Sequence, residues 1–83
     1  MLDPVEILDL QHCRRQDPMW AEKKAGHCLA DAAACDARML EFIDFAAGAI
    51  GPDVAAELVK TANSFGDMAA RYRARAKILM GDD

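Results

Sequence analysis

The sequence predicts an all-α fold, in which a short N-terminal helix precedes a long antiparallel helical hairpin. Alanine, the best intrinsic helix former, supplies 17 of the 83 residues, whereas valine and isoleucine are scarce. Two long segments repeat apolar or small side chains at alternating steps of three and four residues, as amphipathic helices do. A proline stands at the start of each of three segments, where a helix tolerates it. A chain of this length forms one domain, spanning 1–83.

The first helix is expected at about 4–15. Asp3 is a good N-cap residue, and Pro4 suits the first helical position. Glu6 follows Asp3 by three residues, which is the spacing of a capping box. Leu2 and Ile7 occupy the positions of a hydrophobic staple, in which an apolar pair fixes the angle at which the chain enters the helix.

The second helix is expected at about 18–49, because Asp17 and Pro18 repeat the start signal and nothing afterwards forces a stop. At 1.5 Å per residue it would be about 45 Å long. One side of it carries small or apolar residues in a heptad pattern, which Leu29, Ile43 and Ile50 widen. The members of this seam are Ala21, Ala25, Cys28, Ala32, Cys35, Met39, Phe42, Ala46 and Ala49.

The third helix is expected at about 52–80. Gly48 and Gly51 can take the left-handed conformation that ends a helix, and Pro52 can only start a new one. Ser64 and Asp67 have the spacing of a second capping box, which would kink this helix. Its expected seam is Val54, Leu58, Thr61, Phe65, Met68, Tyr72 and Leu79, with Ala62, Ala69 and Ala76 beside it.

A short turn between two long helices forces them to pack antiparallel, so that small side chains of one helix face large side chains of the other. Such a hairpin has little interior, and a helix of about 12 residues adds little more. We therefore expect a homodimer that completes a helix bundle. The residues expected in the core or dimer seam are Cys28, Ala32, Cys35, Met39, Phe42, Leu58, Phe65, Met68 and Tyr72.

Charge is distributed unevenly along the hairpin although the net charge is only −4. The turn end is acidic, with Glu41, Asp44, Asp53 and Glu57. The open end, which we call the basic end, carries Lys23, Lys24, Arg71, Arg73, Arg75 and Lys77. Solubility alone can explain such charges, because long side chains commonly flank a helical seam. The alternatives are a docking surface for an acidic protein or a nucleic acid, and charge complementarity in an antiparallel dimer.

The cysteines and histidines do not form a local metal site. Cys28 and Cys35 are seven residues apart, about 10.5 Å along a helix, which is too far to share one zinc ion. His27 and Asp31 lie one turn apart, but two ligands do not make a site. We expect the cysteines to pack in the core, with no metal and no cofactor. A metal site or a disulfide between two subunits remains the alternative.

Enzymatic activity is not expected. The chain has no Glu-x-x-His pair of the di-iron bundles and no glycine-rich phosphate loop. It also has no nucleophile with a visible histidine and acid partner.

Four residues of the second helix lie roughly opposite its main seam, at about 100° per residue. We call this the outer face: Trp20, His27, Arg38 and Phe45. Either the first helix or a dimer mate covers part of it, or it is an exposed recognition face, because tryptophan and arginine are typical anchors of protein interfaces.

These observations predict a non-enzymatic protein–protein interaction module. It would be an adaptor or inhibitor that covers a surface of a larger partner protein, as small accessory proteins of phages and mobile elements do. The alternatives are a nucleic-acid-associated regulator that uses the basic end, and a subunit of a structural oligomer.

The expected location is cytoplasmic. Three cysteines without a disulfide spacing favour a reducing compartment. No uncharged stretch approaches a membrane span, and the acidic start predicts no targeting peptide.

Overall fold

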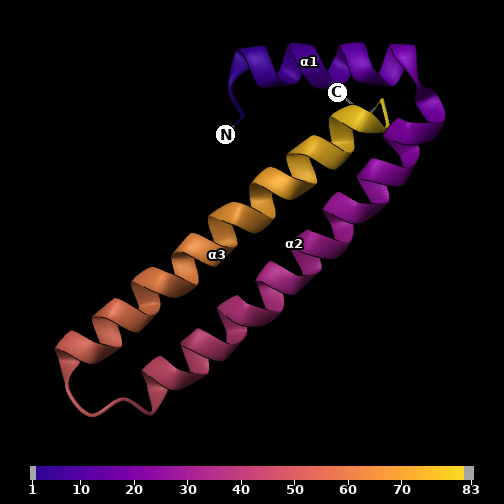
Figure 1. Cartoon of the computed structure of the whole chain (residues 1–83). Helices are drawn as coiled ribbons and strands as arrows, with labels where there is room; N and C mark the ends of the chain where they lie inside the picture. Colours follow the sequence, from indigo (N-terminus) through magenta and orange to yellow (C-terminus); the bar gives the residue numbers. More distant parts are fainter. Residues whose placement is uncertain (1, 82–83) are drawn as a thin grey trace.

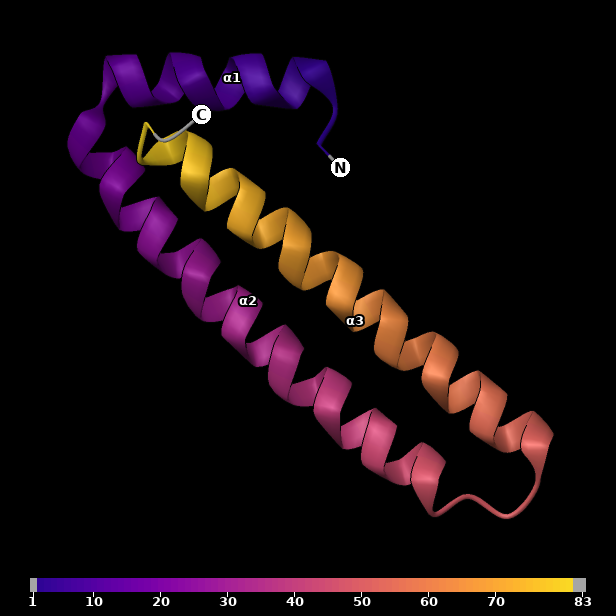
Figure 2. The same ribbon diagram turned by 180° about the vertical axis from the view of Figure 1, so that it is seen from behind.

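The computed structural model describes residues 2–81, and over this range the prediction of an all-α fold is confirmed. The helices are α1 (Pro4–Gln16), α2 (Pro18–Ala47) and α3 (Pro52–Leu79). α2 and α3 lie side by side as an antiparallel hairpin, and α1 lies across the open end of that hairpin (Figure 1). The view from behind shows the same arrangement (Figure 2). The molecule is elongated, measuring 52 × 22 × 14 Å.

The first two helices begin where their capping residues predict. The Asp3 side chain accepts a hydrogen bond from the Val5 backbone N–H at 3.0 Å, and the Asp17 side chain accepts one from the Trp20 N–H at 3.0 Å. The predicted capping box is only half formed, because the Glu6 carboxylate binds a side chain of α3 instead. Each acid still satisfies one of the amide groups that a helix start leaves without an intrahelical partner.

The turn differs from the expected one in where α2 ends. α2 ends at Ala47, two residues earlier than predicted, and Gly48 follows with an ordinary φ of −97°. Gly51 is the residue that takes the left-handed region, with a φ of 110°, immediately before α3 starts. α3 then runs without a break through Ser64, whose hydroxyl donates to the Lys60 carbonyl oxygen at 3.2 Å. The second capping box is therefore absent and α3 is one helix.

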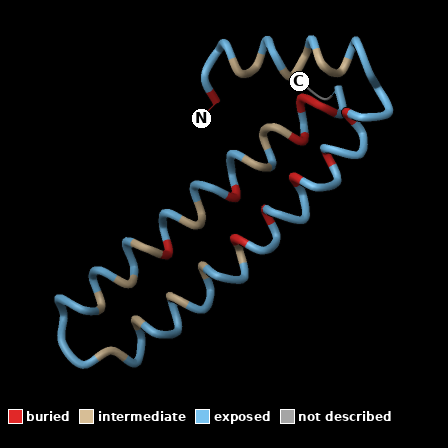
Figure 3. The backbone as a smooth tube through the Cα atoms, viewed as in Figure 1, coloured by how far each residue is buried: buried red, intermediate tan, exposed pale blue. Residues whose placement is uncertain are grey.

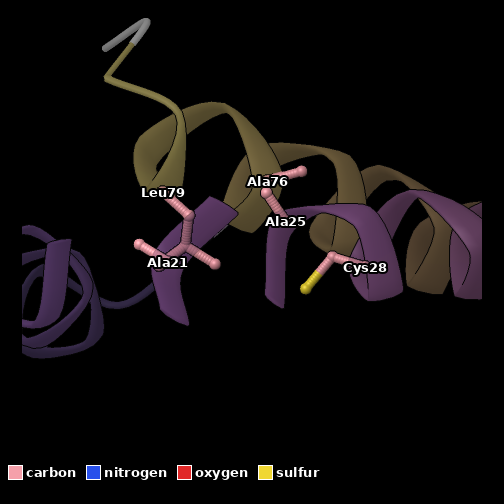
Figure 4. Packing of buried hydrophobic residues seen from close by; sticks show 5 residues of the cluster. All are labelled: Ala21, Ala25, Cys28, Ala76 and Leu79. Carbon is pink, nitrogen blue, oxygen red and sulfur yellow. The ribbon is translucent and has the colours of Figure 1, made fainter. Parts of the chain in front are cut away.

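The core is made mostly of alanine. The residues that the two long helices bury are Ala21, Ala25, Cys28, Ala32 and Cys35 from α2, and Ala62, Ala69, Ala76, Ile78 and Leu79 from α3. Figure 4 shows part of this packing, where Leu79 and Ala76 of α3 meet α2. Alanines on both sides let the two backbones approach closely, because no bulky side chain separates them.

The face of α3 that packs on α2 is turned from the expected seam toward the alanines that were expected beside it. Ala62 and Ala69 are buried, whereas Met68 is 41% exposed and Val54 is exposed. Alanines of α3 therefore lie opposite small residues of α2, while Leu79 packs on Ala21 and Ala25, as the sequence predicted. Phe65 and Tyr72 keep their places and pack on the cluster of Ala32, Cys35 and Ala69 from its edge.

Burial is concentrated in the half of the hairpin nearest α1. Toward the turn, residues 36–61 are all half-buried or exposed, as Figure 3 shows. There the Phe42 ring stacks on Phe65 with 5.6 Å between the ring centroids, and Phe45 meets Phe42 edge-on at 5.9 Å. These rings replace the alanine packing with a looser aromatic contact that leaves Phe45 58% exposed.

α1 is attached to α3 by polar contacts as well as apolar ones. The Arg14 guanidinium donates to the Ile78 carbonyl oxygen at 3.0 Å, near the C-terminal end of α3, where a helix favours a positive charge. The Glu6 carboxylate accepts from Arg75 at 2.6 Å. Leu10 packs on the alanine core, and Leu2 is buried. α1 thereby closes the open end of the hairpin.

Candidate functional site

A hollow lies on the surface of α2, in its N-terminal half. Trp20, Lys23, Lys24 and His27 line it, and its volume is about 240 Å³. These residues are spaced by three, four and seven positions, so one side of α2 presents all of them without help from another helix. Trp20 is 44% exposed, and the two lysines and the histidine are also exposed. The hollow therefore combines an indole ring with two positive charges and an imidazole.

The hollow lies on the best-packed part of the molecule. Ala21, Ala25 and Cys28 lie between its lining residues along the chain and belong to the core cluster that Figure 4 shows. Two of these core residues are at most 1% exposed. Close packing consequently keeps the backbone that carries Trp20 rigid. Because this backbone is already ordered, little backbone entropy is lost when the lining side chains bind a partner.

The four residues of the outer face are all exposed, but they do not form one compact site. Trp20 and His27 share the hollow. Arg38 instead pairs with Glu41, its neighbour one turn on, at 2.8 Å. Phe45 belongs to the aromatic contact at the turn end. Trp20 and Phe45 are 25 residues apart, about 38 Å along the helix axis.

Sequence reasoning assigned Lys23 and Lys24 to the basic end and missed that they line the hollow with Trp20. Their spacing from Trp20, of three and four residues, was the signal that could have shown it, because such residues neighbour each other on a helix.

Two arginines of the basic end form ion pairs between helices. Arg73 on α3 binds both carboxylate oxygens of Asp36 on α2, and this hydrogen bonding raises the pKa of Arg73 above its ordinary value. Arg75 binds Glu6 and lies over the Tyr72 ring at 5.5 Å. Within residues 2–81, no such ion pair forms at the other members, which are Lys23, Lys24, Arg71 and Lys77. The charge available to a partner is therefore smaller than the sequence suggested.

The cysteines are placed as packing residues. Cys28 and Cys35 are buried in the two alanine clusters, and Cys13 is half-buried. All three are free thiols. Across the part of the chain that the structure describes, no three histidine, cysteine, aspartate or glutamate side chains gather where they could hold a metal ion.

Replacing Cys28 and Cys35 together by alanine is expected to leave the fold intact. It is expected to lower the free energy of unfolding by about 1 kcal/mol per site, as small losses of packing do. Guanidinium unfolding measures this cost, with Cys13→Ala as the control at a half-buried position. Metal analysis of protein purified without chelator is expected to find less than one zinc per chain. A stoichiometric zinc that the double variant loses would contradict this assignment.

A second hollow lies between α1 and α3 and is largely apolar. Leu2, Pro4, Ile7, Ala74, Lys77 and Ile78 line it, with a volume of about 460 Å³. Lys77 is its one charged lining residue, so it offers little polar chemistry to orient a ligand.

Comparisons with known proteins do not add to these observations. No helix within residues 2–81 has the length and apolarity needed to cross a membrane. No protein-family model matches the chain, and no similar curated protein or solved structure was found.

Proposed function

We propose that this chain is a non-enzymatic interaction module that docks on a larger protein through the hollow on α2 and covers an acidic surface there. The observation that carries the proposal is the exposed Trp20 set among Lys23, Lys24 and His27 on rigidly packed backbone. Tryptophan is enriched among the residues that dominate interface energetics, since its large ring buries much apolar area with few rotatable bonds.

The positive charge beside Trp20 determines which kind of partner surface the hollow would bind. Lys23 and Lys24 have no carboxylate of their own chain, within residues 2–81, at ion-pair distance. An acidic patch on the partner would therefore meet positive charge without first breaking an internal ion pair. Complementary charge of this kind mainly raises the association rate, whereas burial of the indole slows dissociation.

A nucleic acid as partner is the weaker alternative. Of the six residues in the basic end, Arg73 and Arg75 are engaged with Asp36 and Glu6. Phosphate binding by the rest would weaken by orders of magnitude between low and moderate salt, whereas an interface centred on Trp20 would weaken far less. Binding measured over a salt series distinguishes the two kinds of partner.

The test starts with affinity capture from the source cell lysate, using the chain and its Trp20→Ala variant as parallel baits. The expected result is a protein captured by the first bait and lost with the second. Met19→Ala is the matched control, because Met19 is the adjacent exposed apolar residue and does not line the hollow. With the purified partner, Trp20→Ala is expected to speed dissociation about 10- to 100-fold, which corresponds to burial of one large side chain.

Lys24→Glu is expected to slow association instead, with a larger effect at low salt. Surface plasmon resonance separates the two rates. A partner that binds Trp20→Ala and the unchanged chain equally well would show that the hollow is not the docking site.

A further inference from the structure

A second seam runs along α2, separate from the core seam. Leu29 and Ile43 were expected to widen the core, but they are 44% and 45% exposed. Leu40 is 58% exposed on the same side of the helix. We call this the second seam; its members, alternately three and four residues apart, are Met19, Glu22, Gly26, Leu29, Ala33, Asp36, Leu40, Ile43 and Ala47.

The geometry of the second seam follows from that of the core. From Glu22 onward, each member directly follows a core-seam residue in the chain, as Leu29 follows Cys28 and Leu40 follows Met39. One residue turns a helix by about 100°, so the second seam lies roughly a quarter turn from the core along the whole of α2. A helix at the corner of a four-helix bundle has two contact faces at about this angle, one for each neighbour.

The members of the second seam are exposed apart from the half-buried Asp36, and α1 meets the seam beside Glu22, which shares a hollow with Arg14. Met19 lies close to the junction of α1 and α2 and is nevertheless 83% exposed. α3 covers the core face of α2 and reaches this side at Arg73, which binds Asp36, and at its C-terminal end, where Leu79 and Met80 line a hollow with Glu22. That ion pair gives the central acid of the seam a counter-charge within its own chain, so an apolar partner helix can approach it.

We infer that a second copy of this chain docks on the second seam, with its α2 antiparallel to the α2 of the first copy. We place the two-fold axis of this antiparallel pair near Ala34. In this register Leu29 lies opposite Leu40 of the second copy, and Gly26 lies opposite Ile43 of that copy. Leucines then meet midway along each half of the paired helices, and the small glycine leaves room for the isoleucine. A shift by one heptad would bring Glu22 against Leu40 instead, which buries a carboxylate against an apolar side chain.

Charge complementarity supports the antiparallel direction and a second copy as the occupant. The residues on the outer flank of the second seam are Lys23, Ala30, Ala37 and Asp44. In the antiparallel register Lys23 faces Asp44 of the second copy, twice by symmetry, and Ala30 faces Ala37. A parallel pair would bring like charges together at both ends. Lys23 also borders the hollow, but Trp20, Lys24 and His27 point away from the second seam, so one molecule can carry both contacts.

The first test is sedimentation equilibrium of the full chain at tens of micromolar, for which the expected mass is about twice 9.1 kDa. Leu40→Glu is expected to raise the dimer dissociation constant about 100-fold, because two carboxylates enter apolar positions in each dimer. Leu8→Glu on α1 is the matched control, since Leu8 is 62% exposed and lies outside the second seam. It is expected to change the constant less than about threefold. Circular dichroism verifies that both variants keep their helices.

The second test is a charge exchange. Lys23→Glu alone and Asp44→Lys alone are each expected to raise the dimer dissociation constant about three- to tenfold. The double variant is expected to restore the constant to within about twofold of the original.

A chain that is monomeric at 100 micromolar would overturn the inference. So would a dimer that Leu40→Glu leaves unchanged, or a double variant weaker than both single ones. Trp20→Ala is expected to leave the dimer intact, so failure of this inference and failure of the proposed function are distinguishable.

Discussion

Replacing Leu79 by alanine is expected to lower the free energy of unfolding by about 2–5 kcal/mol, the range for a buried leucine truncated to alanine. Leu79 is 2% exposed and is the largest side chain in the cluster with Ala21, Ala25, Cys28 and Ala76. Its alanine neighbours are too small to move into the space, so the cavity stays open and its lining loses contacts outright.

Guanidinium unfolding at fixed protein concentration measures the loss at Leu79, and Leu8→Ala is the matched control. Leu8 is the same residue type at 62% exposure on α1, and its truncation is expected to cost less than about 0.5 kcal/mol. A Leu79→Ala variant as stable as the Leu8→Ala variant would mean that Leu79 does not hold α1, α2 and α3 together.

Replacing Ala69 by leucine is expected to destabilise the fold by about 1–3 kcal/mol, because added atoms have no room in a close-packed core. Ala69 is 0% exposed and packs against Ala32 and Cys35 of α2. A leucine there must push α3 away from α2 or take a strained rotamer. The close approach that alanines permit on both helices would then be lost.

Ala70→Leu is the matched control for this overpacking, because Ala70 is the next residue of α3 and is exposed. Ala70→Leu is expected to change the free energy of unfolding by less than about 0.5 kcal/mol, since leucine is nearly as good a helix former as alanine. Thermal and guanidinium unfolding followed by circular dichroism give both values. If Ala69→Leu were as stable as Ala70→Leu, the seam that contains Met68 would be the one facing α2.

The candidate site was only partly predictable. The exposure of Trp20 and His27 follows from their position opposite the core seam of α2, and spacing alone would have added Lys23 and Lys24. The ion pairs of Arg73 and Arg75 could not be predicted from the sequence. Arg73 is 37 residues from its partner Asp36, and Arg75 is 69 residues from its partner Glu6. Proximity between such residues arises only once helices are packed.

The sequence by itself determined the local structure of this protein. Asp3 and Asp17 start the first two helices, the segment around Gly51 makes the turn, and the short turn forces α2 and α3 to run antiparallel. Each of these features depends on residues that are neighbours in the chain, so local hydrogen bonding and backbone sterics suffice to decide it.

Only the tertiary structure decided which side of α3 faces α2. Adjacent stripes on one helix, one through Met68 and one through Ala69, both keep the three-and-four spacing, so the apolar pattern fits either. The choice depends on the side chains of both helices at once. With Ala32 and Cys35 opposite, the alanine stripe lets the backbones pack most closely, whereas the methionine stripe would hold them apart. The same packing turned Glu6 toward Arg75 and left the second seam of α2 exposed.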